Sequence, residues 1–391
     1  MKKLILLLAV FFAYASFGQN CNTLLEAVET GDLEKVTQLL KTVDPNCVAK
    51  KVAMERCFYG EHMYYKEKAK SPLMAAAQKG NIDMAKLLVS KEGKVNLYVE
   101  GDGNALLTSS RYGHLDFVKY LVNNGVDPKE SFPNHGNALI SAANKGRIDI
   151  VKYLIEDHGL EVDKVFANQG TALNRAANNG HIETIKYLLS KGAKINRITS
   201  NHGTALIRAA NNGIIETVKY LISQGAQADL VTSNHGTALL AAANNGYIET
   251  IQYLLKVGVD VNQSTSNHGT ALIRAANNGH LETIKFLLEN GADVNQISSN
   301  HGTALIRAAN NGHIETLKLL LENGANVNQI SPNHGTALIR AANNGHTKTV
   351  KYLVSKGAKV NTRVNERTAM SAAQKNGYRD TVAYLKRQGG K

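Results

Sequence analysis

The hydrophobic and polar positions of this chain follow one short pattern along most of its length. Residues 204–213, TALIRAANNG, begin with a threonine suited to cap a helix and end with a glycine suited to stop one. Residues 214–224, IIETVKYLISQ, space their apolar side chains as a second amphipathic helix does. Gly225 and the turn-forming segment 226–236, AQADLVTSNHG, follow. The pattern predicts two short helices and a hairpin-like connection in each unit.

A glycine after the first predicted helix marks a repeat of about 33 residues. It recurs at Gly31, Gly80, Gly113, Gly146, Gly180, Gly213, Gly246, Gly279, Gly312, Gly345 and Gly377. Neither helix can bury its apolar face alone, so stability must come from stacking the units into one continuous core. The step from Gly31 to Gly80 contains an insertion of about 16 residues, a length typical of a functional or protruding loop.

The period, the helix–turn–helix order and residues 269–296, GTALIRAANNGHLETIKFLLENGADVNQ, resemble the ankyrin repeat. The resemblance covers residues 22–389 and about eleven units. It implies an all-α repeat solenoid, an ankyrin-like stack of helix–turn–helix units joined by β-hairpin-like loops. The family motif T-P-L-H reads T-A-L-I here, and alanine is a good helix former at the first turn. The turn glycine stands one place later than usual, because His202 precedes Gly203.

Helical geometry divides the side chains of residues 204–213 between two faces. At about 100° per residue, the leucine and the paired alanines fall together on the side that the core would cover. Arg208, Asn211 and Asn212 fall on the opposite side. In stacks of the ankyrin type, this side of the first helix and the hairpin tips form the concave groove through which partners usually bind. The resemblance therefore implies that these three polar side chains face a partner.

Stacking extends this polar stripe into a ladder of arginines and asparagines, interrupted at Ala241. The candidate partner-binding residues are Arg175, Asn178, Asn179, Arg208, Asn211, Asn212, Asn244, Asn245, Arg274, Asn277, Asn278, Arg307, Asn310, Asn311, Arg340, Asn343 and Asn344. Guanidinium groups flanked by amides suit the carboxylates or backbone of an extended or acidic protein segment. The alternative is that the asparagines bond the neighbouring repeat and that tandem duplication explains the near-identity. The sequence leaves both interpretations open.

Histidines also recur at the hairpin tips, where adjacent imidazoles would be able to share a metal. They are His135, His202, His235, His268, His301 and His334. No cysteine or carboxylate recurs beside them to complete a tetrahedral set, so the pattern favours a role in hairpin stability. The sequence predicts no metal site and no cofactor.

The motifs of common enzymes are missing from the sequence, including G-x-S-x-G, H-E-x-x-H, the phosphate loop and Cys-x-x-Cys. Every polar candidate occurs in five or six copies, whereas an active site needs one asymmetric arrangement. The sequence therefore predicts a non-enzymatic, monomeric scaffold for a protein partner of unknown identity.

The formal net charge of +13 is concentrated at the C-terminal end of the chain. Residues 333–391 hold 12 lysines and arginines against Glu366 and Asp380, while residues 19–332 are nearly neutral. This distribution argues against a nucleic-acid groove along the whole molecule. We expect residues 366–391 to form a basic capping repeat. Its charge suggests an alternative function, association with an envelope surface or an anionic polymer.

The first 18 residues, MKKLILLLAVFFAYASFG, have the lysines, apolar run and small residues of a secretory signal peptide. The apolar run is too short to cross a bilayer. We therefore expect residues 19–391 to be one ankyrin repeat domain that is exported and is periplasmic or secreted. The style of the signal suggests a bacterial envelope.

The inserted segment 43–70 concentrates cysteines and aromatic side chains between the first two units. Export permits disulfides, and of the three cysteines we predict that Cys47 and Cys57 pair across a short loop, leaving Cys21 free. The aromatic candidates for anchoring a partner are Phe58, Tyr59, Tyr64 and Tyr65. Exposed aromatics of this kind often anchor interfaces. An equally good interpretation is that they fold back and cap the N-terminal repeat.

Overall fold

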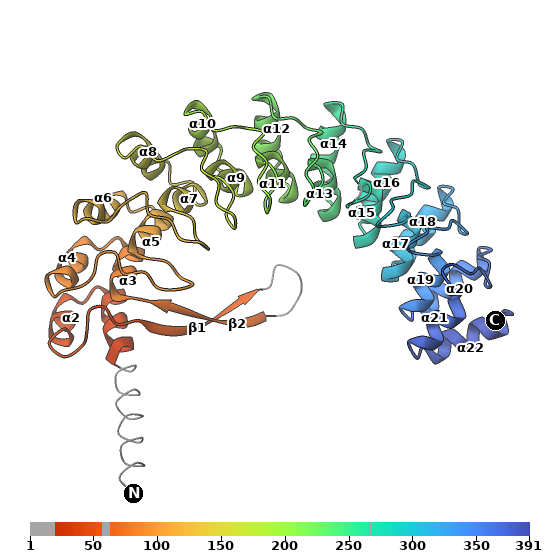
Figure 1. Cartoon of the computed structure of the whole chain (residues 1–391), viewed down its shortest axis with the longest axis horizontal. Coiled ribbons are helices and arrows are strands. Elements are labelled where there is room, and N and C mark those ends of the chain that lie inside the picture. The colour runs from red at the N-terminus through yellow and green to blue at the C-terminus, as the bar shows by residue number, and fades with distance from the viewer. Residues whose placement is uncertain (1–19, 57–62, 266) are drawn as a thin grey trace, which may run out of the picture. The chain divides into compact units, whose positions relative to one another are not determined.

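The computed structural model describes residues 20–56, 63–265 and 267–391. The predicted signal peptide lies outside these residues. The chain divides into two compact units, the first reaching Ala176 and including residues 181–193, the second comprising residues 177–180 and 194–391. Figure 1 shows the helices succeeding one another in pairs within each unit. Over the described residues there are eleven such pairs, which confirms the predicted helix–turn–helix repeat.

The helix bounds of the first unit are as follows. Residues 20–30 are helical, and the next elements are α2 (Leu33–Leu39), α3 (Pro72–Lys79), α4 (Ile82–Ser90), α5 (Ala105–Tyr112), α6 (Leu115–Asn123), α7 (Ala138–Ala143), α8 (Ile148–Glu156), α9 (Ala172–Asn178) and α10 (Ile182–Ser190). Helix α9 ends in residues that cluster with the second unit. From α3 onward, odd-numbered helices are the first of each repeat and even-numbered helices the second.

The second unit continues the same alternation without an inserted segment. Its helices are α11 (Ala205–Asn211), α12 (Ile215–Ser223), α13 (Ala238–Asn245), α14 (Ile248–Lys256), α15 (Ala271–Asn278), α16 (Leu281–Glu289), α17 (Ala304–Asn311), α18 (Ile314–Glu322), α19 (Ala337–Asn343), α20 (Thr347–Ser355), α21 (Ala369–Lys375) and α22 (Arg379–Arg387). The last pair, α21 and α22, lies within the predicted basic capping repeat. No helix in the described part of the chain has the length and apolar character needed to cross a membrane.

The first helices begin and end where their caps place them. Thr270 caps α15 by accepting a hydrogen bond from the backbone N–H of Ile273 at 3.2 Å, and Gly279 ends the helix with φ of 73°. Helices this short are marginal alone, so packing must hold them. The paired alanines of α15, Ala275 and Ala276, are fully buried, and α15 packs against α13 and α17. Small side chains at this contact let neighbouring first helices approach closely, as the sequence predicts.

The second helices bury a narrower stripe. In α16, Ile284 and Leu287 are fully buried, while Lys285 and Glu289 are exposed. The helix has no side-chain cap, but Glu282 in its first turn complements the positive end of the helix dipole. Helix α16 packs on α15 of its own repeat and on α14 and α18 of its neighbours. The apolar core therefore continues from repeat to repeat.

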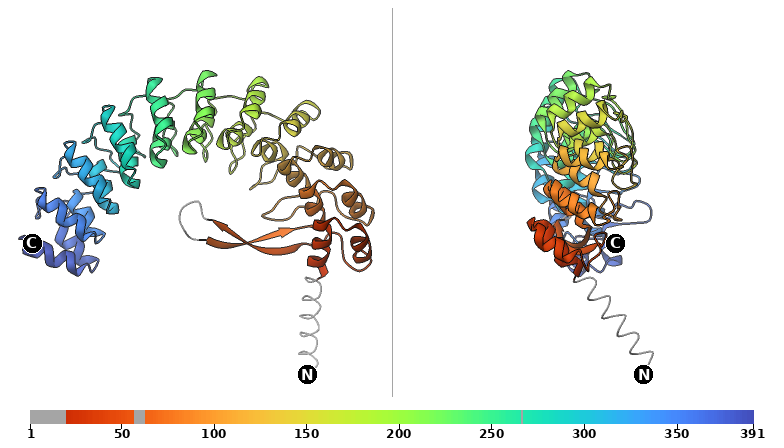
Figure 2. Two further views of the ribbon diagram at one scale, coloured as in Figure 1. Left: turned by 180° about the vertical axis from the view of Figure 1, so that it is seen from behind. Right: turned by 90° about the vertical axis from the view of Figure 1, so that its left-hand side faces the viewer.

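The inserted segment is more ordered than the predicted loop. Strands β1 (Ala49–Arg56) and β2 (Met63–Lys70) pair antiparallel, with Ala49 opposite Lys70 and Arg56 opposite Met63. Figures 1 and 2 show this two-stranded hairpin projecting from the helices of the first unit. Side-chain periodicity did not predict this hairpin, because strand pairing depends on two segments and not on the pattern within one. Among the predicted anchors, Tyr64 and Tyr65 belong to β2, while Phe58 and Tyr59 lie outside the described residues.

The base of this hairpin is tied to the first repeats. The backbone N–H of Ala69 donates to Asp102 Oδ2 at 2.7 Å. Lys70 Nζ donates to Glu29 Oε1 at 3.0 Å and to Gln78 Oε1 at 2.6 Å. These contacts fix where β2 enters the helical stack.

The predicted disulfide is wrong. The structure joins Cys21 to Cys47, with their Cα atoms 6.0 Å apart, whereas Cys57 lies outside the described residues. Cys21 is buried in the helical segment 20–30, and the turn after α2 brings Cys47 back to it. The fold of the first repeat brings Cys47 close to Cys21, so the disulfide joins these two residues and not the pair that is closest in sequence.

Candidate functional site

The predicted polar stripe lies on one side of the second unit, which we call the ladder face. It consists of the outward sides of α11, α13, α15, α17 and α19 together with the loops that precede these helices. The ladder arginines and the first asparagine of each pair are half-buried there, whereas Asn245, Asn278 and Asn311 are exposed. The structure thus places the predicted residues together, and their hydrogen bonds show what holds them.

The arginine of α15 is bound to the loop before its own helix. Arg274 donates from Nε to the carbonyl of His268 at 2.9 Å, and its Nη2 lies 2.7 Å from His268 Nδ1. Because a guanidinium carries hydrogen on every nitrogen, His268 Nδ1 must be the acceptor. The other ring nitrogen, Nε2, then carries the proton and donates to the carbonyl of Ser233 at 3.2 Å. Arg274 therefore fixes the position of the loop before α15 and the tautomer of the His268 imidazole.

The next two repeats reproduce this arrangement. Arg307 Nε donates to the carbonyl of His301 at 2.8 Å, and its Nη2 lies 2.9 Å from His301 Nδ1. Arg340 Nε donates to the carbonyl of His334 at 2.8 Å, and its Nη2 lies 2.8 Å from His334 Nδ1. Loop and helix are thus joined three times in succession by an arginine–histidine pair.

Two arginines differ from these three. Arg175, in the first unit, donates from Nε to the carbonyl of Gln169 at 2.8 Å, so glutamine stands where later repeats have histidine. Arg208 turns to the preceding helix, and its Nε and Nη2 lie 3.0 and 2.6 Å from Asn178 Oδ1.

The histidines of these pairs are kept neutral by their surroundings. Burial lowers the pKa of His268, and the nearby Arg274 lowers it further. Burial and the neighbouring arginines likewise lower the pKa of His301 and of His334. Burial also lowers the pKa of Arg274, Arg307 and Arg340, although a guanidinium remains charged at neutral pH. The ladder face therefore carries the arginine charges beside neutral imidazoles.

We expect mild acid to destabilise the second unit through these histidines. Their folded-state pKa values lie below the ordinary value of about 6.5, so near that value the unfolded chain binds more protons. Stability is then fully present above about pH 6.5 and is lost as pH falls toward the folded-state values. A histidine protonated at Nδ1 could no longer accept the hydrogen bond from its arginine, and its positive charge would repel the guanidinium. Thermal melts between neutral pH and pH 5 should show the midpoint falling by a few degrees. A variant with glutamine at positions 268, 301 and 334 should show a flatter dependence, and an equal slope in both proteins would contradict the prediction.

The asparagine pairs connect successive repeats. In five of the pairs, the second asparagine donates Nδ2 to the backbone carbonyl of the first asparagine one repeat earlier. The bonds are Asn212 to Asn178 at 2.7 Å, Asn245 to Asn211 at 3.1 Å, Asn278 to Asn244 at 2.6 Å, Asn311 to Asn277 at 2.6 Å and Asn344 to Asn310 at 2.7 Å. Carbonyls at a helix end lack partners inside the helix, so these amides satisfy them. The second asparagine of these pairs therefore holds neighbouring repeats together, as the scaffold interpretation expects.

Histidines at the start of the second helices reinforce the same carbonyls. His280 Nε2 lies 3.0 Å from the carbonyl of Asn244, and His313 Nε2 lies 3.1 Å from that of Asn277. No group of three histidine, cysteine, aspartate or glutamate side chains suited to a metal ion occurs within the described residues.

A second asparagine ladder, which was not predicted from the sequence, lies in the loops between repeats. Asn262 donates Nδ2 to the carbonyl of Gly291 at 3.0 Å and accepts from the backbone N–H of Asp293 at 2.7 Å. Asn295 makes the same pair of bonds to the backbone of Gly324 and Asn326. The signal was available, because an asparagine after valine recurs with the repeat at Asn262, Asn295, Asn328 and Asn361.

Comparison with known families agrees with this architecture. The family model described as "Ankyrin repeats (3 copies)" matches residues 24–132, 124–199, 198–265, 258–331 and 305–391. The chain belongs to the ankyrin repeat family. Ankyrin repeats generally mediate protein–protein interactions. No curated protein sequence matches the chain.

Among solved structures, the ankyrin repeat protein is similar to the human ASB11 ankyrin repeat domain. The two chains are 30% identical, the match covers 56% of this chain and 98% of that one, and the TM-score is 0.49.

Proposed function

We propose that this ankyrin repeat protein is a non-enzymatic scaffold whose ladder face binds an acidic segment of a protein partner. The observation that carries the proposal is the set of hydrogen bonds made by Arg274, Arg307 and Arg340. Their hydrogen bonds in the described structure go to carbonyls and neutral imidazoles, and none of the ion pairs found there joins them to a carboxylate. Three positive charges therefore remain for a partner to neutralise.

The same contacts prepare these arginines for binding. A guanidinium has five N–H donors, and Arg274 uses two of them in its own repeat. Its side chain is already ordered, so a partner need not supply the entropy of fixing it. Half-burial also keeps water from fully screening the charge. An extended acidic segment would meet successive guanidiniums in successive repeats.

The test compares two variants that remove the same charge from the same repeats. One replaces Arg274, Arg307 and Arg340 with alanine. The control replaces Lys285, Lys318 and Lys351 on the second helices α16, α18 and α20. Each full-length variant is expressed in the source cells, cross-linked and purified, and the partner is quantified by mass spectrometry.

We expect the arginine variant to lose most of the partner and the lysine variant to retain it. Thermal melts establish that both variants are folded at the temperature of capture. Equal capture by the two variants would show that the ladder arginines do not bind the partner.

We also propose that the protein is exported and works in the bacterial envelope. The Cys21–Cys47 bond supports this, because disulfides persist in oxidising compartments. Fractionation of cells making the full chain with a C-terminal tag should find the processed protein outside the cytoplasm. Unprocessed protein in the cytoplasmic fraction would contradict the proposal.

The last repeat supports a second candidate function, association with an anionic surface. Lys375, Arg379, Lys386 and Arg387 are all exposed on α21 and α22. Binding to anionic vesicles should weaken steeply with salt and should be lost when alanine replaces these four residues. Failure to bind at low salt would eliminate this candidate.

A further inference from the structure

In the repeat that contains α13, the arginine–histidine hydrogen bonds of the ladder face are missing. Ala241 takes the place of the arginine, so His235 lacks the partner that His268 has in the next repeat. The first asparagine of this helix is also different. Asn277 donates Nδ2 to the side chain of Asn278 at 3.0 Å, but no such bond is found in the described structure for Asn244. Asn245 keeps the regular bond to the carbonyl of Asn211 and also donates to the carbonyl of Ala241 at 3.1 Å.

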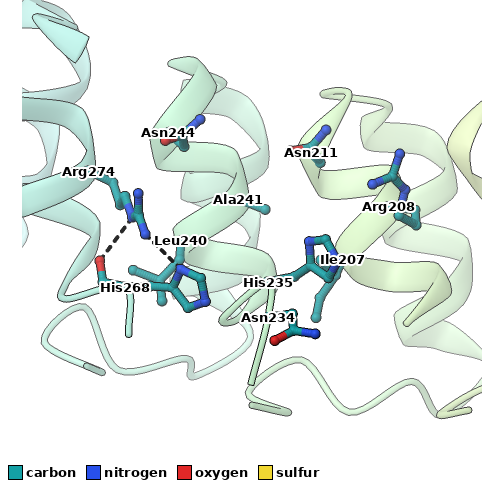
Figure 3. Close-up of a pocket in the computed structure, with 10 residues that line it drawn as sticks. All are labelled: Ile207, Arg208, Asn211, Asn234, His235, Leu240, Ala241, Asn244, His268 and Arg274. Carbon is teal, nitrogen blue, oxygen red and sulfur yellow. Dashed lines mark hydrogen bonds between the residues drawn. The ribbon is translucent and has the colours of Figure 1, made fainter. Parts of the chain in front are cut away.

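These changes surround one cavity of about 200 Å³, the Ala241 cavity. Figure 3 shows Ala241 between Arg274 on one side and Arg208 on the other, with Asn244 and Asn211 along one edge. Buried Ile207 and Leu240 supply an apolar wall, and none of the described residues that line the space carries a carboxylate. A water molecule needs only about 10–15 Å³ by this measure, so the cavity is large enough for a side-chain group.

The missing arginine explains the space. A second cavity, of about 230 Å³, lies beside Arg340 and Arg367 next to the last repeat. Counting back from Gly377, the ladder position of that repeat is Ala372, but Ala372 does not line this second cavity. The Ala241 cavity differs because an arginine from each adjacent repeat flanks it and because His235 lacks an arginine from its own repeat.

We propose that the Ala241 cavity is a subsite for the carboxylate of an aspartate or glutamate side chain of the partner. The inference rests on the proposed function and identifies where on the ladder face a partner residue inserts. Arg274 and Arg208 supply positive charge on both sides, and the amide of Asn244 supplies a donor. Ile207 and Leu240 would contact the methylene groups of the entering side chain. Charge-assisted hydrogen bonds to a carboxylate are stronger than hydrogen bonds between neutral groups.

The test fills the cavity with the residue that the other repeats use. Ala241→Arg adds a positive charge, so attraction by charge alone predicts tighter binding of an acidic probe, whereas a subsite predicts weaker binding. Gln252→Arg is the matched control, because it adds the same charge to the exposed side of α14 in the same repeat. Asn244→Ala is a second variant, which removes a donor without filling the space.

The probe is a fluorescein-labelled oligoglutamate peptide, with oligoglutamine of equal length as the neutral reference, measured by fluorescence anisotropy on the full chain. We expect Ala241→Arg to weaken oligoglutamate binding about tenfold, which corresponds to the loss of one charge-assisted hydrogen bond. Asn244→Ala should weaken it less, and Gln252→Arg should not weaken it. The melting temperature of Ala241→Arg should equal or exceed that of the natural protein, since arginine is the usual residue here.

Other outcomes separate the possible failures. If Ala241→Arg binds the peptide as tightly as the natural protein or more tightly, the subsite is overturned. The proposed function then stands only if alanine at 274, 307 and 340 abolishes binding. If that triple variant binds normally, both proposals fail. Displacement of the peptide by low millimolar sodium acetate would identify a site for free small anions and overturn the assignment to a partner side chain.

Discussion

Replacing Leu287 with alanine is expected to lower the free energy of unfolding by about 2–5 kcal/mol. Leu287 is fully buried in α16, and this helix packs on both neighbouring second helices. The change removes apolar contacts and leaves a cavity that close-packed neighbours fill only partly. In a repeat protein, each unit is stabilised mainly by its neighbours, so the defect weakens two interfaces at once.

Urea unfolding followed by circular dichroism would measure this effect. The control is Leu288→Ala in the same helix, because Leu288 is only half-buried and has less apolar surface to lose. We expect the midpoint to shift clearly more for Leu287→Ala than for Leu288→Ala. Similar small shifts for both would mean that α16 does not contribute to a continuous core as described.

Breaking the Cys21–Cys47 bond is expected to destabilise the N-terminal repeat by roughly 2–4 kcal/mol. The bond joins residues separated by 26 positions and constrains the unfolded chain around α2. In the described structure α2 packs on α4 of the next repeat, and contacts of this kind must offset the loss. A Cys21→Ser, Cys47→Ser variant should therefore exchange amide hydrogens faster across residues 20–43, while the second unit stays protected.

Cys57→Ser is the matched control for the disulfide, because this change leaves both bonded cysteines in place. It should leave exchange in the first repeat unaltered. Peptide mapping without reductant should recover Cys21 linked to Cys47 from the natural protein. A peptide linking Cys47 to Cys57 would contradict the pairing in the structure.

The arginines of the ladder face have a scaffold role in the structure and a binding role in the proposed function, and mutation must separate the two. Arg274 joins its helix to the preceding loop, which is a scaffold role, and it leaves donors and charge for a partner. Arg→Ala changes remove both roles at once, whereas Ala241→Arg adds the scaffold role while closing a cavity. Comparing the two therefore tests binding independently of stability.

Much of the fold could be predicted from single repeats. Thr204 caps α11 through the N–H of Ile207, and the paired alanines Ala209 and Ala210 are fully buried. These features depend on side chains within one turn or two of a helix, so local pattern suffices. The polar face of the first helices, which is half-buried in most repeats, was predicted for the same reason.

The sequence offered bonding of the asparagines of this face to the neighbouring repeat as one of two interpretations, but it did not specify the partner atoms. Asn278 bonds the carbonyl of Asn244 one repeat away, and Asn262 bonds the backbone around Gly291. Each contact depends on how far one repeat is shifted and turned relative to the next, which no local pattern specifies. The second asparagine ladder was visible as a recurring residue, but its function required the stack.

The sequence by itself determined the repeat, its two helices, their caps and the division between core and polar faces, because helical periodicity and capping act over a few residues. Only the tertiary structure decided that Cys21 pairs with Cys47, that β1 and β2 form a hairpin, and that an alanine in place of one arginine opens a cavity between Arg208 and Arg274. Each of these features depends on contacts between separate segments, which no pattern within a single segment specifies.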